Sequence, residues 1–182
     1  CEGQQLDMEF ENRSDVSIPE YIDMIRLKTA VLLGGAMKLG AIVAKAKPEE
    51  AELIYVFGEN LGIAFQLQDD ILDVFGDPEK FGKQIAGDII ANKKTFLLLK
   101  LQELVSKEDQ AKLTDQFTNK NIEDKIKHIT DLYHSYKIRE LATQEMKSYL
   151  NKAFTALNKI TIAESRKSEI IKLAEELMSR EH

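Results

Sequence analysis

Three aspartates and a glutamine stand close together in an otherwise apolar stretch, Phe65-Gln66-Leu67-Gln68-Asp69-Asp70-Ile71-Leu72-Asp73. In a helix, Asp69 and Asp73 are one turn apart, and Gln66, Asp70 and Asp73 follow one ridge. Like charges at this spacing destabilise a helix by roughly 0.2–0.5 kcal/mol, and partial burial adds to the cost. A bound cation would offset it. Oxygen-only ligands favour a hard ion such as Mg²⁺, which bridges one or two carboxylates to the phosphates of a substrate.

The same stretch has two alternative interpretations. A set of acidic side chains is often a solvated helix face, but apolar residues flank these acids on several sides, which disfavours a free polar surface. A calcium loop fits poorly, because the alternating ligands, central Gly and terminal Glu of an EF-hand are missing. The flanking apolar residues are Ile63, Phe65, Leu67, Ile71, Leu72, Val74 and Phe75.

Cationic and hydroxyl side chains occur on both sides of the acidic stretch. Lys28 adjoins Thr29 upstream, and Lys83 follows Gly82 downstream. Asp88 comes next, followed by Lys93, Lys94 and Thr95. Alone, each lysine is typical of a solvated surface. As a set beside a metal-binding helix, they favour a diphosphate site, where metal ions hold some phosphate oxygens and ammonium groups hold others.

The elements that must position these groups are all helical. Ser17 and Glu20 form a capping box with Pro19 in the first turn, so a long helix is expected to begin there and to carry Lys28. Pro48 opens the helix that carries the acids, expected to run to about Val74. Further helices are expected at 92–105, 108–118, 121–134, 137–159 and 164–180. No strand pattern is evident, and the sequence predicts an all-α antiparallel bundle.

Length, composition and charge exclude several classes of protein. With 182 residues and 43% apolar residues, the chain can form one domain, 1–182. A net charge of −6 argues against a nucleic-acid binder. One cysteine, Cys1, excludes an intrachain disulfide and fits a reducing compartment, so a cytoplasmic location is expected. The most apolar run, 30–46, is too short for a transmembrane span. Because the chain begins inside an expected helix without a methionine, a fragment or cleaved chain is also expected.

The ordered motifs resemble the C-terminal part of a trans-isoprenyl diphosphate synthase, the family of farnesyl and geranylgeranyl diphosphate synthases. The resemblance covers nearly the whole chain, and several motifs in order make it more specific than a single acidic motif. The matching segments are Gly3-Gln4-Gln5-Leu6-Asp7, Lys28-Thr29, Phe65-Gln66-x-x-Asp69-Asp70-x-x-Asp73, Gly82-Lys83, Asp88, Lys93 and Tyr136-Lys137-Ile138-Arg139-Glu140.

The resemblance implies the isoprenoid synthase fold, an antiparallel helical bundle around a central cavity with two aspartate-rich motifs facing each other. The motif in this chain resembles the second of the two. The first, with longer acidic spacing and adjacent arginines, has no counterpart in the 182 residues. N-terminal helices of the fold are therefore expected to be missing, and this chain alone is not expected to be a complete synthase.

The resemblance also implies roles for individual residues. Asp69 is expected to ligate Mg²⁺ directly, while Asp70 and Asp73 ligate the ion or position it through water. Lys28 and Lys93 are expected to contact the allylic diphosphate, as is Lys83 from its loop. Thr29 and Gln66 are expected beside the reacting carbons. The candidate catalytic residues are Lys28, Thr29 and Gln66.

Other residues have supporting roles in this interpretation. Phe65 and Gln4 are counted as substrate-binding, and Asp88 is expected to orient the lysines or metal-bound water. Asp7 is expected to pair with an arginine of the missing half. Arg180 is at best a weak substitute for the basic C-terminal tail of many family members.

The implied function is a Mg²⁺-dependent prenyltransferase that condenses an allylic diphosphate with isopentenyl diphosphate. A homodimer is expected, as is common in the family. Two alternatives stand beside it. A non-catalytic subunit or inactive fragment would not need Lys28, Thr29, Gln66, Asp69 and Asp73, and a terpene cyclase has no obvious use for the Lys28-Thr29 and Gly82-Lys83 elements.

Overall fold

The computed structural model describes residues 1–77 and 86–179. Both ranges are helical with short connections and contain no strand, which confirms the predicted all-α fold. In chain order the elements are α1 (Glu2–Glu11), α2 (Ile18–Ile25), the π-helix η1 (Arg26–Ala30), α3 (Val31–Val43), α4 (Pro48–Phe75), α6 (Gly87–Ile90), α7 (Phe96–Leu104), α8 (Lys107–Phe117), α9 (Ile122–Ser135), α10 (Ile138–Asn158) and α11 (Glu164–Met178).

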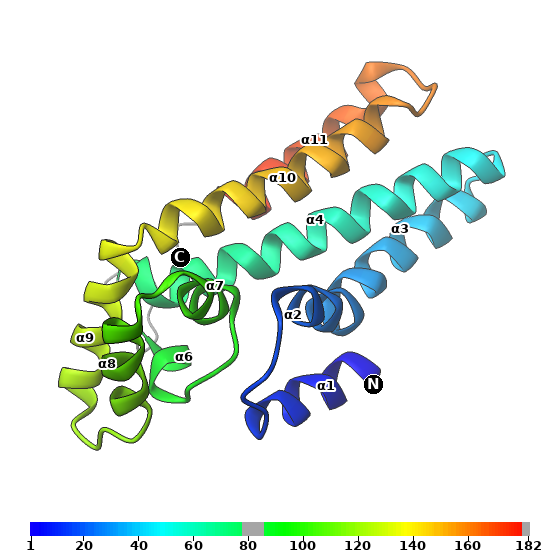
Figure 1. The fold of residues 1–182 in the computed structure, drawn as a ribbon. Helices are drawn as coiled ribbons and strands as arrows, with labels where there is room; N and C mark the ends of the chain where they lie inside the picture. Colours follow the sequence, from blue (N-terminus) through cyan, green and yellow to red (C-terminus); the bar gives the residue numbers. More distant parts are fainter. Residues whose placement is uncertain (78–85, 180–182) are drawn as a thin grey trace.

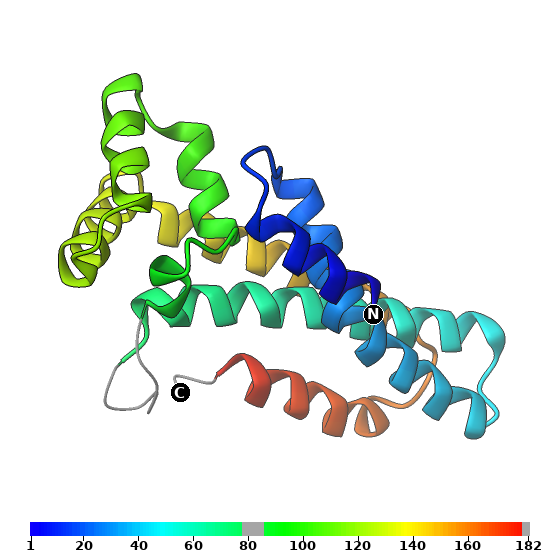
Figure 2. The ribbon, with the colours of Figure 1, turned by 90° about the horizontal axis from the view of Figure 1, so that it is seen from below.

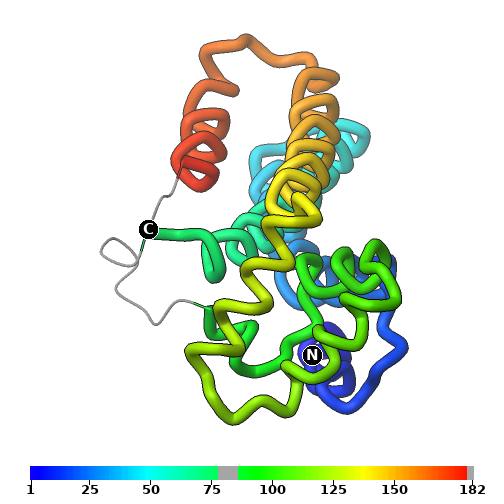
Figure 3. Tube along the Cα trace, turned by 60° about the vertical axis from the view of Figure 1, so that its left-hand side comes forward, coloured from blue at the N-terminus to red at the C-terminus, as the bar shows by residue number. Residues whose placement is uncertain are grey.

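Helix α4, with 28 residues, runs through the middle of the fold (Figure 1). α3 and α10 pack along it, and α11 follows it on the side opposite to α1 and α7 (Figure 2). α10 and α11 run antiparallel to each other (Figure 3). The central position of α4 agrees with its sequence, which is apolar on more than one side. None of the described helices combines the length and apolarity that a membrane span requires.

The apolar core has two parts that share α4. One lies around the C-terminal half of α4 and includes buried side chains of α2, α7 and α9. The other lies around the N-terminal half and includes α10 and α11. The first part supports the acidic stretch, and its largest fully buried members are Tyr21, Leu67, Leu97, Leu101, Leu113, Ile129 and Ile138.

The predicted capping box at the start of α2 is present. The Ser17 hydroxyl accepts a hydrogen bond from the Glu20 backbone N–H, and the Glu20 carboxylate accepts one from the Ser17 N–H. α2 then continues through η1 into α3 without a break. Single π turns inside a helix often occur at functional sites, and this one contains Lys28 and Thr29.

Small residues bring this helical run against α4. A Cβ on Gly62 would lie 2.7 Å from Cα of Ala30, and one on Gly34 would lie 2.8 Å from the Tyr55 carbonyl oxygen. Gly34 thus permits close contact between α3 and α4. Contact at this distance fixes the Lys28 turn relative to the part of α4 that leads into the acidic stretch.

One predicted boundary is wrong. Lys93, Lys94 and Thr95 precede α7 instead of forming the first turn of a helix over 92–105. Asn92 adopts a left-handed backbone conformation with φ of 53°, and the Thr95 N–H donates to the Lys93 carbonyl in a tight turn. Residues 93–95 therefore form a connector between α6 and α7.

Candidate active site

Asp70 is held by donors from two other helices. Oδ2 of Asp70 accepts a hydrogen bond from the Tyr21 hydroxyl on α2 at 2.5 Å and a longer one from the Phe96 N–H on α7 at 3.4 Å. Burial raises the pKa of the Asp70 carboxyl to about 7; the nearby Asp88 charge acts in the same direction, while the Tyr21 hydrogen bond and Lys93 oppose it. Without a bound cation this carboxylate is therefore costly to ionise.

Asp73 anchors the chain that follows the acidic helix. Its carbonyl oxygen accepts from the Ala86 N–H at 2.6 Å, and its Oδ2 accepts from the Asp88 N–H at 3.0 Å. Ala86 has a φ of 64°, which turns the chain into α6. These contacts place Asp88 beside Asp73, so α4 and α6 present their carboxylates together.

Lys93, on the connector, places a positive charge beside these carboxylates. Its Nζ lies 3.4 Å from Oδ1 of Asp88, and its backbone N–H donates to the Asp88 carbonyl at 2.9 Å. Burial alone would lower the pKa of Lys93, but the carboxylates of Asp88, Asp70 and Asp7 outweigh it, and the net shift is upward. Lys93 is thus a fixed positive charge that faces carboxylates on α1, α4 and α6.

Burial, the largest effect, and the neighbouring Asp73 charge raise the pKa of Asp88, and Lys93 acts against them. Asp7 and Lys93 also line one cavity of about 260 Å³, together with Lys94 of the connector. The cavity has both signs of charge on its walls. A polyanion that enters it would meet the ammonium group of Lys93.

Lys28 reaches the same region from the π turn. Its Nζ lies 2.6 Å from Oδ2 of Asp7 on α1. α1 approaches closely because Gly3 lies against the η1 backbone, where a Cβ would be 2.2 Å from the Lys28 nitrogen. The predicted arginine partner of Asp7 is therefore not needed to satisfy this carboxylate, because Lys28 of the same chain pairs with it.

The remaining predicted residues lie around this group or outside the described ranges. The Gln66 side-chain amide donates to Oδ2 of Asp69 at 3.4 Å, one turn further along α4. Asp69 is exposed, and Phe65 and Thr29 are partly buried. Gln4 is exposed on α1. The Gly82-Lys83 element and Arg180 lie outside the residues that the structure describes.

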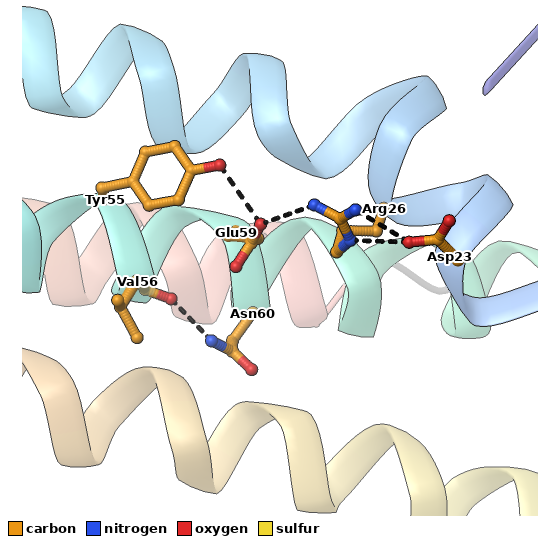
Figure 4. A network of polar contacts seen from close by, with 6 residues as sticks. All are labelled: Asp23, Arg26, Tyr55, Val56, Glu59 and Asn60. Carbon is orange, nitrogen blue, oxygen red and sulfur yellow. Dashed lines mark hydrogen bonds and ion pairs between the residues drawn. The ribbon is translucent and has the colours of Figure 1, made fainter. Parts of the chain in front are cut away.

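A second polar network, which no local sequence pattern indicates, lies where α2 passes into η1 (Figure 4). Nη2 of Arg26 lies 2.8 Å from the Asp23 carboxylate, and Nη1 lies 3.4 Å from Oε1 of Glu59 on α4. The Tyr55 hydroxyl donates to the same Glu59 oxygen at 3.2 Å. This network ties the end of α2 and the start of η1 to α4.

The donor set fits Mg²⁺, although no three His, Cys, Asp or Glu side chains of the described residues form a ready cage. Mg²⁺ usually keeps several waters and binds through one or two carboxylates plus substrate phosphates, so a protein-only cage is not required. Asp69 is accessible on α4, and Asp70 and Asp73 are partly buried on the same helix. All three supply oxygen ligands only.

Sequence reasoning missed Tyr21 and the Phe96 N–H. The spacing of Tyr21 with Ile25 is typical of a core stripe, so the local pattern indicates an apolar packing role for Tyr21. Its partner Asp70 lies 49 residues further along the chain. No local pattern indicates that pairing.

Comparison with known proteins gives a consistent result. The polyprenyl synthetase family model matches residues 1–134. The chain is 36% identical over 170 residues to a geranylgeranyl diphosphate synthase of Sulfolobus acidocaldarius, covering 93% of this chain and 50% of that protein. It is 34% identical over 182 residues to a short chain isoprenyl diphosphate synthase of Methanothermobacter thermautotrophicus, covering 100% of this chain and 55% of that protein.

Solved structures agree with these matches. The crystal structure of geranylgeranyl pyrophosphate synthetase from Pyrococcus horikoshii Ot3 superposes with a TM-score of 0.89 at 33% identity, covering 99% of this chain and 54% of that one. A geranylgeranyl pyrophosphate synthase structure gives 0.88 at 42% identity, covering 99% and 57%. The chain thus spans about half the length of the relatives described here.

Proposed function

Because the chain belongs to the polyprenyl synthetase family, we propose that it forms the second aspartate-rich half of a Mg²⁺-dependent prenyltransferase active site. The reaction would condense an allylic diphosphate with isopentenyl diphosphate to a longer trans-prenyl diphosphate. The observation that carries the proposal is the convergence of Lys93 with the carboxylates of Asp70, Asp73 and Asp88, brought together from the connector, α4 and α6. Lys28 of η1 joins them through Asp7, whose carboxylate it contacts and which also lies near Lys93.

Asp69, Asp70 and Asp73 would hold Mg²⁺, which when bound would neutralise part of the charge on the diphosphate. Lys28 and Lys93 supply ammonium groups for other phosphate oxygens, and we propose the same for Lys83. Asp88 keeps Lys93 in place through the 3.4 Å contact. Oriented charges of this kind lower the barrier to departure of the leaving group.

The bond that breaks joins C1 of the allylic substrate to the diphosphate oxygen, and its electron pair leaves with pyrophosphate. The double bond of isopentenyl diphosphate then attacks C1, and a proton is lost to the departing pyrophosphate. Gln66 and Thr29 would face the developing cation with an amide dipole and a hydroxyl, and Phe65 would shield it from water. Gln4 would contact substrate from α1.

We also propose that residues 1–182 form one domain of a cytoplasmic homodimer. The family resemblance supports the dimer. The absence of a membrane-spanning helix among the described residues is compatible with the location. The opposing aspartate-rich motif is not present in the 182 residues, so the proposed activity is that of the protein that contains both motifs.

Pyrophosphate release tests the proposal. The full protein, given Mg²⁺, isopentenyl diphosphate and a short allylic diphosphate, should release pyrophosphate, and Asp69→Ala should lose most of that rate. Glu49→Ala is the matched control, because Glu49 is an exposed acid in the first turn of the same helix. An unchanged rate in the Asp69 variant would contradict the role of Asp69, and no release by the unaltered protein would favour a non-catalytic subunit.

A further inference from the structure

Tyr21 connects the lysine-bearing helical run to the acidic stretch. It is 2% exposed on α2, and its hydroxyl donates to Oδ2 of Asp70 at 2.5 Å. A buried tyrosine hydroxyl usually has a hydrogen-bond partner, and a charged acceptor makes such a bond stronger. The contact joins α2 to α4 across 49 residues of sequence.

The two donors to Asp70 bind the same carboxylate oxygen. The Tyr21 hydroxyl and the Phe96 N–H both reach Oδ2. Within the described residues, no protein donor reaches Oδ1 of Asp70. Two bonds to one oxygen fix the plane of the carboxylate and leave the other oxygen for another ligand.

Tyr21 also lies on the same continuous helical run as Lys28, because α2 passes directly into η1. The capping box at Ser17 fixes the start of that run. A shift of Asp70 would therefore be transmitted through Tyr21 to the turn that carries Lys28. The two kinds of group that a diphosphate requires are mechanically linked.

We propose that Tyr21 is a positioning residue, whose hydroxyl holds Asp70 in the orientation needed to bind a divalent cation together with a diphosphate. The inference rests on the proposed function of the site. Partners that orient a metal ligand typically contribute 10–100-fold to metal affinity or activity. Tyr21 need not contact substrate to have this effect.

Tyr133 provides a matched control. It is also 2% exposed, and it lies among the same carboxylates, lining a small cavity with Asp88 and Lys93. Its ring packs against Phe75, and within the described residues its hydroxyl makes no hydrogen bond. Tyr133→Phe therefore removes the hydroxyl of an equally buried tyrosine without removing a bond to a carboxylate.

The test measures binding of inorganic pyrophosphate by titration calorimetry at increasing Mg²⁺ concentration. Tyr21→Phe should raise the Mg²⁺ concentration for half-maximal binding about 10-fold, while Tyr133→Phe stays close to the unaltered protein. Tyr21→Phe should add nothing in the Asp70→Asn background, because its effect passes through Asp70. Unchanged Mg²⁺ dependence in Tyr21→Phe, or full additivity with Asp70→Asn, would overturn the inference.

A second measurement does not depend on the stability of the Tyr21 variant. The ¹³C resonance of the Tyr21 Cζ should move in Asp70→Ala, because the ring loses its acceptor, and an unmoved resonance would contradict the inference. Failure of the proposed function is distinguishable. In that case the unaltered protein would bind no pyrophosphate in a Mg²⁺-dependent manner, whereas failure of the Tyr21 inference alone leaves that binding intact and insensitive to Tyr21→Phe.

Discussion

The ammonium group of Lys28 lies 2.6 Å from Oδ2 of Asp7, and both side chains are partly buried. α1 and the π turn are held together at this point by Gly3, which permits backbone contact. The lysine proposed to bind diphosphate is therefore already held by a carboxylate. Asp7 connects it in turn to the cavity that Lys93 lines.

The contact between Lys28 and Asp7 predicts that mutations of the two residues have non-additive effects on pyrophosphate binding. Lys28→Ala should weaken pyrophosphate binding about 10-fold, which is typical for loss of a charge-assisted hydrogen bond. Asp7→Asn should have a smaller effect, because the ammonium group remains but loses its orientation. In the double variant the Asp7 change should add little. Calorimetric titration of the three variants measures this, and full additivity would show that the two residues act independently.

The close contact at Gly3 predicts a stability difference between two glycines. Gly3→Ala should destabilise by about 1–3 kcal/mol, because its Cβ would overlap backbone atoms of η1. Gly35→Ala is the control, since a Cβ there meets open space, and it should be neutral or stabilising by about 0.5–1 kcal/mol. Thermal unfolding measures both. Equal midpoints would show that α1 does not rest on η1 in solution.

The raised pKa of Asp70 predicts how metal-free stability changes with pH. The carboxyl titrates near 7 in the folded state and near 3.9 in an unfolded chain. The folded state therefore binds the proton more tightly, and this contribution is fully present below about pH 4 and is lost as pH rises toward 7. The substitution Asp70→Asn removes this pH-dependent contribution to stability.

Thermal unfolding in a chelator at pH 5 and at pH 7.5 checks the sign. The midpoint of the unaltered protein should fall more between these two values than that of Asp70→Asn. If the two proteins respond equally, the Asp70 carboxyl is not buried in the manner described.

Local sequence signals predicted much of the fold. The Ser17 and Glu20 capping box, the Pro48 start of α4 and the amphipathic segments depend on neighbours within a few residues, and their predicted bounds lie close to the observed ones. The Asn92 turn was missed because a left-handed residue inside a polar segment leaves no periodic signal. The π turn at Lys28 depends on packing against α1 and α4, which local spacing does not reveal.

The candidate site, like the fold, could be predicted from the sequence only in part. The residue types and their order identified Asp70, Asp73, Asp88 and Lys93, which the structure brings together. Their roles in binding remain predictions. The partners of these residues were missed, because Tyr21 with Asp70 and Lys28 with Asp7 are pairs between distant elements. Such pairs are set by tertiary packing.

The central claim is that the acids of α4 and the lysines of η1 and the connector form one Mg²⁺-dependent diphosphate site. Calorimetric binding of inorganic pyrophosphate tests it most directly. Binding should require Mg²⁺, disappear with a chelator, and weaken at least about 10-fold in both Asp69→Ala and Lys93→Ala, but not in Glu49→Ala. Binding that persists in the chelator, or that Asp69→Ala and Lys93→Ala leave unchanged, would contradict the account.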